Sequence, residues 1–321
     1  MLKDKFGRHI DYMRVSVTDR CNLRCIYCSQ KDAFSWIPHG EILSYEELFE
    51  ILDQAVKLGI RRIRLTGGEP LVRKGLISFI RQISKAWGLK DLSLTTNGTL
   101  LAEVAAELKE SGLTRVNISL DTLRPERFKE ITGFDYWHRV WAGIEAALAT
   151  KLAPVKINVV VLRGINDDEI LDLARLTLHY PLEVRFIEFM PVGKGAAWEK
   201  KYFYSTKEVI ERLRPLGPLV PVVTQGGGPA HTFCISGALG KIGFISAMTH
   251  HFCATCNRIR LTADGRLRPC LFSDYEINIK SLLRRPHRTE EIRAYIKQAV
   301  DAKPRDRLQG RPQRLMRSIG G

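Results

Sequence analysis

The chain has 321 residues, of which 45% are hydrophobic, and a formal net charge of +15 at pH 7. This length supports a large core and about two domains. It has no run of about 18 apolar residues that would predict a membrane span, and its first residues, "MLKDKFGRHIDYMR", have no signal-peptide core, so we expect a cytoplasmic protein that does not bind membranes.

Six strand patterns alternate with helical patterns through the first two thirds of the chain. The strands are predicted at 12–18, 61–66, 91–96, 115–121, 154–161 and 183–190. Helical patterns at 44–59 and 167–180 are among those between them, and Ser44 with Glu47 predicts a capping box at the start of the first. This alternation indicates an α/β fold with a parallel sheet.

Most of these strands alternate polar and apolar residues. In the first strand Val15 and Val17 face one side, whereas Arg14 and Ser16 face the other. The interior of a closed eight-stranded barrel is apolar, so a polar face has to meet water or a ligand. We therefore predict an incomplete (β/α)6 TIM-like barrel with an open, polar cavity. An open antiparallel sheet with one wet face is the alternative, but the intervening helices disfavour it.

A change of composition marks the last third of the chain. The segment 214–230 is rich in Pro and Gly and is interpreted as a linker. We predict a barrel domain at 1–225 and a C-terminal α+β extension at 226–321. Short strands are expected in the extension at 233–236, 241–246 and 257–272, the last with a turn at Asp264–Gly265.

The chain has seven cysteines, and six of them form two groups of three. Cysteines of a cytosolic protein stay reduced, so a disulfide framework is not expected. The seventh, Cys234, is interpreted as a small core residue. The groups are Cys21, Cys25 and Cys28, called here the first triplet, and Cys253, Cys256 and Cys270, the second triplet.

Three thiolates do not complete a structural zinc site, which needs four ligands. They do suit a 4Fe–4S cluster that is held at three corners and leaves its fourth iron open to a ligand. For the second triplet, zinc completed by His250 or His251 stays open as an alternative. The matching number of cysteines favours a second cluster.

Several motifs resemble those of a known family. "CNLRCIYC" (21–28) resembles the cysteine signature of radical S-adenosylmethionine enzymes, and "TGGEP" (66–70) resembles the segment that binds the methionine amino group of that cofactor. "FCATCNRIRLTADGRLRPCLF" (252–272) resembles the C-terminal motif of the GTP 3′,8-cyclase family. The resemblance extends from about residue 10 to the terminal glycine pair, through stretches such as "NISLD", "KINVVV" and "RFIEFMP".

The resemblance implies a lyase with two 4Fe–4S clusters and S-adenosylmethionine as cofactors. It would cyclise GTP to (8S)-3′,8-cyclo-7,8-dihydroguanosine 5′-triphosphate, the first step of molybdenum cofactor biosynthesis. In the family a 5′-deoxyadenosyl radical takes a hydrogen from the ribose, and the second cluster binds the guanine. GTP and a cellular one-electron reductant would be the partners, without nucleic acid, and the protein would be a monomer or homodimer.

The resemblance also assigns roles to residues. Both triplets would hold iron. The cofactor contacts would be Tyr27, Gly68, Ser119 and Met190. The GTP contacts would be Arg14, Arg64, Thr95, Lys156, Arg258, Ile259 and Arg260. The catalytic group would comprise Arg258, Arg260, Gly320 and Gly321. Independently, Arg14, Arg64, Thr95, Ser119 and Lys156 fall on the polar strand faces described above.

Two other functions remain open from the sequence. One is a radical S-adenosylmethionine enzyme that modifies a peptide or RNA, against which the "CNRIR" segment and the short C-terminal cysteine set argue. The other is a zinc-stabilised basic protein that binds nucleic acid without catalysis, because the net positive charge suits any anionic partner.

Overall fold

The computed structural model describes residues 1–28, 36–192, 200–223, 228–283, 288–306 and 312–320. These residues form one sheet with the strand order β12-β11-β10-β1-β2-β3-β4-β5-β6-β9-β8-β7. Its six central strands follow the chain and are parallel. They are β1 (Tyr12–Ser16), β2 (Arg62–Thr66), β3 (Asp91–Thr96), β4 (Arg115–Ser119), β5 (Val155–Val161) and β6 (Leu182–Glu188).

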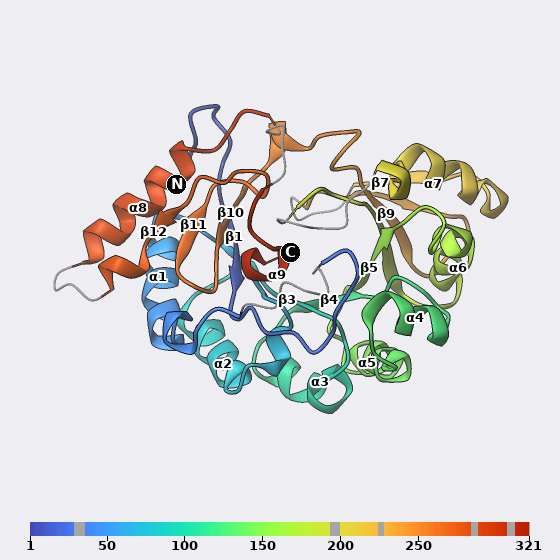
Figure 1. Ribbon diagram of the computed structural model, residues 1–321, viewed down its shortest axis with the longest axis horizontal. Helices are drawn as coiled ribbons and strands as arrows, with labels where there is room; N and C mark the ends of the chain where they lie inside the picture. The colour runs from blue at the N-terminus through green and yellow to red at the C-terminus, as the bar shows by residue number, and fades with distance from the viewer. Residues whose placement is uncertain (29–35, 193–199, 224–227, 284–287, 307–311, 321) are drawn as a thin grey trace.

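Helices connect these strands and line the outside of the curved sheet (Figure 1). They are α1 (Tyr45–Leu58), α2 (Leu76–Ala86), α3 (Leu101–Glu110), α4 (Pro125–Thr132), α5 (Trp137–Ala149) and α6 (Ile170–His179). The predicted capping box begins α1, with the Ser44 side chain accepting from the Glu47 N–H and the Glu47 side chain from the Ser44 N–H. The prediction of an α/β fold with a mostly parallel sheet is confirmed.

The two faces of the sheet differ in chemistry but are both largely buried. Val15, Ile63 and Leu65 belong to the hydrophobic core and have no exposed surface. On the opposite face Arg64 and Lys156 are each only 8% exposed. The inner face is therefore a polar interior, and the chain has to satisfy several buried charges there.

The C-terminal strands extend the sheet at both of its edges. At one edge, β9 (Lys241–Ile245) pairs in parallel with β6 and continues through β8 (His231–Cys234) to β7 (Val220–Val222). At the other, β10 (Arg258–Leu261) pairs in parallel with β1, followed by β11 (Arg266–Arg268) and β12 (Ile277–Asn278). Strand β7 lies within the segment predicted to be a linker. The remaining helices include α7 (Thr206–Leu213) and α8 (Thr289–Asp301).

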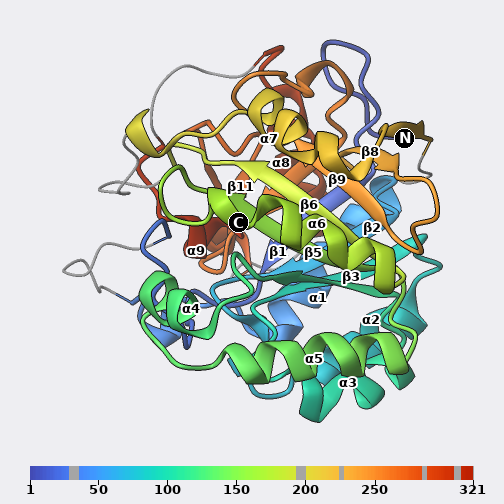
Figure 2. The same cartoon turned by 90° about the vertical axis from the view of Figure 1, so that its right-hand side faces the viewer.

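The C-terminal segment returns to the inner side of the sheet, where α9 (Met316–Ile319) lies (Figures 1 and 2). Both terminal nitrogens of Arg314 bind Asp264, at 2.8 and 2.7 Å, and its Nε lies 2.9 Å from Glu276. These ion pairs attach the segment to the turn between β10 and β11 and to the residue that precedes β12. The carbonyl of Gly320 then accepts a hydrogen bond from Arg260, so the chain end adjoins the cationic part of the inner face.

Glycine is the residue that fits at position 320. Its φ is +70°, and a Cβ there would lie 2.2 Å from the Thr66 Oγ1 atom. A side chain would therefore be strained and would collide with the end of β2. The other glycine of the predicted catalytic pair, Gly321, lies outside the described residues.

Candidate active site

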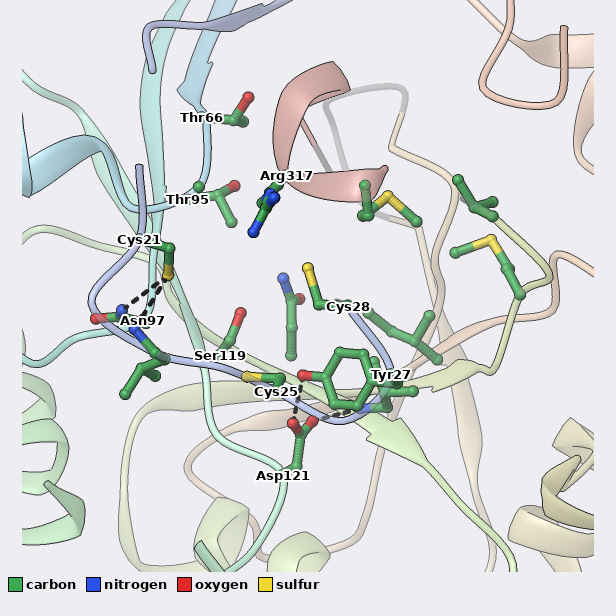
Figure 3. Close-up of a pocket in the computed structure, with 18 of the residues that line it drawn as sticks. Cys21, Cys25, Tyr27, Cys28, Thr66, Thr95, Asn97, Ser119, Asp121 and Arg317 are labelled. Carbon is green, nitrogen blue, oxygen red and sulfur yellow. Dashed lines mark hydrogen bonds between the residues drawn. The ribbon is translucent and has the colours of Figure 1, made fainter. Parts of the chain in front are cut away.

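A cavity of about 220 Å³ lies at the carboxyl ends of the parallel strands (Figure 3). This is the edge at which open parallel sheets bind their ligands. The first triplet lines the cavity, as do all four predicted cofactor contacts and Thr95. Loops after β1 and β2, the ends of β3 to β6, and α9 therefore all contribute to one site.

The first triplet occupies the loop that follows β1. Figure 3 shows Cys21, Cys25 and Cys28 around the space into which Arg317 descends from α9. Burial raises the pKa of Cys21 to about 12 and also raises the pKa of the other two thiols. Coordination to iron would deprotonate these thiols despite their burial, as metal ions do.

The donor set of this loop fits a four-iron cluster. Across the described residues, no three His, Cys, Asp or Glu side chains converge as they would around a single metal ion. In a cluster each cysteine binds a different iron, so the sulfurs stand further apart. Three cysteines on one loop face a shared cavity, so the loop can offer one thiolate to each of three irons.

Two buried polar atoms indicate a polar ligand beside the triplet. The Thr95 Oγ1 and Asn158 Oδ1 atoms line the cavity and have no hydrogen-bond partner among the described residues. Buried polar atoms are rarely left unpaired, because each costs free energy. A ligand with polar groups, such as S-adenosylmethionine, would satisfy them.

The glycines of the "TGGEP" loop have a packing role in addition to the predicted one. A Cβ at Gly67 would lie 2.4 Å from the Thr18 carbonyl oxygen, and one at Gly68 would lie 2.3 Å from that of Arg20. The resemblance assigns this segment to the methionine amino group of the cofactor, and that assignment stays a prediction. The structure adds that neither position has room for a side chain, because this loop packs against the backbone leading into Cys21. Both glycines still line the cavity.

Tyr27 is held in place by a carboxylate that the sequence analysis missed. Its hydroxyl donates to the Asp121 Oδ2 atom at 2.5 Å, and the Val160 N–H donates to Oδ1 at 2.8 Å (Figure 3). The ring meets Phe189 edge-on, with centroids 6.5 Å apart. Burial raises the pKa of Asp121 to about 6. The sequence feature that could have identified Asp121 is its position at the end of the fourth predicted strand, because parallel strands present binding groups at their carboxyl ends.

Glu69 positions the wall of the cavity beside Cys21. This fully buried carboxylate accepts hydrogen bonds from the Leu71 N–H at 3.0 Å, the Thr96 hydroxyl at 2.8 Å and the Asn97 N–H at 2.6 Å. Asn97 in turn reaches the Cys21 sulfur at 3.8 Å. Burial raises the pKa of Glu69 to about 7. Glu69 belongs to the "TGGEP" motif, but the motif by itself indicated no role for it.

Three predicted substrate contacts form a row across adjacent strands. Arg14 on β1 is in register with Arg260 on β10 and with Arg64 on β2. Burial and the neighbouring arginines lower the pKa of Arg14, and burial foremost lowers those of Arg64 and Arg260 to about 10. Within the described residues, Arg64 and Arg260 form no ion pair with a carboxylate. The row is thus a buried, positively charged surface suited to an anion.

The same face carries a second basic group across β5 and β6. Lys156 and Arg185 share one carboxylate, Glu183, at 2.7 and 2.6 Å. Burial foremost lowers the pKa of Lys156 to about 8. Sequence reasoning named Lys156 but missed Arg185, although its alternation with apolar neighbours in "EVRFIEFM" places it on the polar face.

The side chains of the other two predicted substrate contacts on β10 point to opposite faces of the sheet. Arg258 lies over the Phe252 ring at 4.8 Å and reaches the Cys256 sulfur at 3.8 Å. Ile259 points the other way, into the hydrophobic core, with no exposed surface. A contact of Ile259 with substrate would therefore have to use its backbone.

The second triplet has a more cationic environment than the first. Burial would raise the pKa of Cys256, but Arg258 and Lys303 outweigh it and lower that pKa to about 7. Burial raises the pKa of Cys253, whose electrostatic neighbours include Cys256 and Cys270. The Nδ1 atom of His251, a candidate zinc ligand, lies 3.1 Å from the Ala247 carbonyl oxygen.

Comparison with known proteins identifies the family. The GTP 3′,8-cyclase of Thermodesulfovibrio yellowstonii is 50% identical over 323 residues, covering 100% of both chains. The chain belongs to the GTP 3′,8-cyclase family. The GTP 3′,8-cyclase of Heliobacterium modesticaldum is also 50% identical, over 326 residues and 99% of each chain. Sequence models of the Radical SAM superfamily and of Molybdenum Cofactor Synthesis C match residues 15–177 and 182–308.

Solved structures share the fold at low sequence identity. Streptococcus suis SuiB matches with a TM-score of 0.60 and 17% identity, over 91% of this chain and 70% of that one. The protein anSMEcpe with bound AdoMet matches with a TM-score of 0.55 and 18% identity, over 88% and 82% of the two chains. These structures show the fold. The curated relatives and the two sequence models show that the protein is a radical SAM enzyme of molybdenum cofactor synthesis, which uses S-adenosylmethionine and an iron–sulfur cluster. In the part of the chain that the structure describes, no helix is long and apolar enough to cross a membrane.

Glu69 predicts a pH-dependent stability. Folding raises the pKa of Glu69. Its contribution to the free energy of unfolding is therefore fully present below its pKa in the unfolded chain, about 4.5, and is lost as the pH rises through its pKa in the folded protein, about 7. Glu69→Gln removes this titration but places an amide opposite N–H donors. We expect the variant to be less stable than wild type at pH 5. The difference in free energy of unfolding should narrow by roughly 1–3 kcal/mol by pH 8, because only the wild type loses stability as Glu69 ionises. Denaturant unfolding at both pH values measures this, and a constant difference would contradict it.

Proposed function

We propose that the enzyme converts GTP into (8S)-3′,8-cyclo-7,8-dihydroguanosine 5′-triphosphate, using S-adenosylmethionine and two 4Fe–4S clusters, one at each triplet. We interpret its curved sheet as an incomplete (β/α)6 barrel at 1–225, with 226–321 as the auxiliary-cluster region and tail. The curated relatives are named for this cyclisation.

One observation carries the proposal: a row of buried arginines lies between the two triplets. Cys21 follows β1, whereas Cys256 precedes β10. Because β1 and β10 are parallel neighbours, the triplets lie toward opposite ends of this strand pair. Arg14 and Arg260 lie in register between them. A nucleoside triphosphate held by the row would have one cluster site on each side.

The cavity side binds and orients the cofactor. Cys21, Cys25 and Cys28 would hold the first cluster, which together with bound S-adenosylmethionine would supply radical chemistry, with an electron from a cellular one-electron reductant. Tyr27 and Met190 offer apolar surface, whereas Ser119 at the end of β4 and Gly68 in the loop after β2 offer polar groups. The Thr95 hydroxyl lies on the same face as Lys156 and points into this cavity, so it is placed to contact either ligand.

The cationic side binds the triphosphate. The proposed contacts are Arg14, Arg64, Lys156, Arg258, Arg260 and the backbone of Ile259. Arg185 is a further cation on this face. Each charge-assisted hydrogen bond contributes roughly 1.5–3 kcal/mol, so a few of them give useful affinity. An anion here would also offset the repulsion among buried cations. The carbonyl of Gly320 holds Arg260, which supports the proposed role of Gly320 and Gly321 next to the substrate.

The activity itself gives the first test. After anaerobic reconstitution, turnover with S-adenosylmethionine and each of the four ribonucleoside triphosphates should yield a cyclised product from GTP, together with 5′-deoxyadenosine. ATP, CTP and UTP should give little product, because the second cluster site would select guanine. Cofactor cleavage without cyclised GTP would refute the proposed substrate and leave peptide or RNA modification as the alternative.

The number of clusters follows from the two triplets. Anaerobically reconstituted enzyme should hold about eight irons and little zinc, since each 4Fe–4S cluster contributes four irons. Cys270→Ser should reduce the iron content to about four while leaving the first cluster spectrum intact. Metal analysis decides between the alternatives, because four irons with one zinc in the wild type would establish a zinc site at the second triplet.

The arginine row predicts a selective loss of GTP binding. Arg64→Gln and Arg260→Gln should each weaken equilibrium GTP binding by roughly 10–100-fold, as expected for a lost bond between charged groups. Iron content should stay at the wild-type value. Arg175→Gln is the matched control, because Arg175 is an exposed residue on α6 that pairs with Asp172. If the variants lost both their iron and their folded structure, the two arginines would have a structural role.

A further inference from the structure

A buried lysine lies directly behind the second triplet. Lys303 follows α8 and is only 4% exposed. Its N–H donates to the Val300 carbonyl, and Ile292, Ile296 and Val300 anchor the helix in the core. The lysine backbone is therefore held in a fixed position, at the helix end where a positive charge is favourable.

The side chain of Lys303 uses all three of its donors. Its Nζ atom lies 3.7 Å from the Cys256 sulfur, 2.6 Å from the Arg258 carbonyl oxygen and 3.0 Å from the Pro269 carbonyl oxygen. An ammonium group has three N–H donors, so this set of acceptors is matched to it. Pro269 immediately precedes Cys270. One cation thus ties together the segments that carry two of the three cysteines.

The third cysteine is held by a cation from the other end of the chain. Arg8 donates to the Cys253 carbonyl at 2.7 Å and to the Pro304 carbonyl at 2.7 Å. Asp4, which has a buried side chain, forms an ion pair with Arg8 and so fixes its guanidinium. Because Pro304 follows Lys303, the two cations and the three cysteine segments form one connected network.

We propose that Lys303 is a positioning residue of the second cluster site, which it builds by fixing the Cys256 and Cys270 segments and by donating a hydrogen bond to the Cys256 sulfur. This inference rests on the proposed function, because it requires a cluster at the second triplet. Three thiolates bring negative charge into a partly buried site, and a fixed ammonium offsets it. Groups that hydrogen-bond to ligand sulfurs also stabilise the more negative, reduced form of a cluster.

The test isolates the second cluster. In a parent protein with Cys21, Cys25 and Cys28 all changed to Ala, only the second triplet can bind a cluster. Adding Lys303→Met to this parent should make iron loss to a chelator roughly 10-fold or more faster, the usual effect of losing such an outer partner. The midpoint potential of the remaining cluster, followed by electron paramagnetic resonance, should move to a more negative value.

Two further variants in the same parent separate positioning from general stability. Lys297→Met, at an exposed position on α8, the helix that precedes Lys303, should match the parent in iron retention and potential. Arg8→Gln should speed iron loss but shift the potential less than Lys303→Met, since Arg8 reaches a carbonyl rather than a sulfur.

The outcomes distinguish this inference from the proposed function. A parent that binds no iron would refute the second cluster itself, and with it this role of Lys303. A parent that binds four irons, with Lys303→Met unchanged in iron loss and potential, would overturn the inference alone. In the otherwise wild-type chain, Lys303→Met should keep the first cluster and the circular dichroism spectrum. Loss of both would show that Lys303 serves the fold as a whole, which also overturns the inference.

Discussion

The burial of positive charge on the inner face of the sheet is the constraint on which this structure depends. Cations are costly to bury unless they are paired, and here Glu183 serves both Lys156 and Arg185 while Arg64 and Arg260 form no described ion pair. Desolvation foremost lowers the pKa values of these groups, and repulsion from neighbouring arginines adds to it. The buried cations lower the stability of the fold without a ligand. A bound anion would offset this loss, so the surface favours anion binding.

The parallel sheet makes this arrangement possible by separating two tasks. Its outer face packs apolar residues such as Val15 and Ile63 against the helices and holds the fold together. Its inner face is thereby free to carry polar groups, and its strand ends carry the loops of the first triplet and of the cavity. The pairing of β10 with β1 then brings the second triplet, which is remote in sequence, to the opposite end of the same strands.

Buried charged groups also position the loops around each cysteine triplet, and the groups at the two triplets have opposite charge. Glu69 and Asp121 accept hydrogen bonds that fix the cavity walls beside the first triplet. Lys303 and Arg8 donate hydrogen bonds that fix the second. The difference matches the proposed ligands. The first site would receive a sulfonium cation, whereas the second adjoins the arginines that would hold a polyphosphate, where further positive charge favours anion binding.

The sequence by itself determined the six central strands, their polar and apolar faces and the two cysteine triplets, because periodicity and spacing are local properties of the chain. It also indicated Arg14, Arg64 and Lys156 as inner-face residues. Only the tertiary structure decided that β10 adds beside β1, that "TGGEP" needs glycine for packing against Thr18 and Arg20, and that Gly320 reaches Thr66. These contacts join segments far apart in sequence. No local pattern encodes which distant backbone or buried carboxylate will fill a given space, since that depends on how the whole core packs.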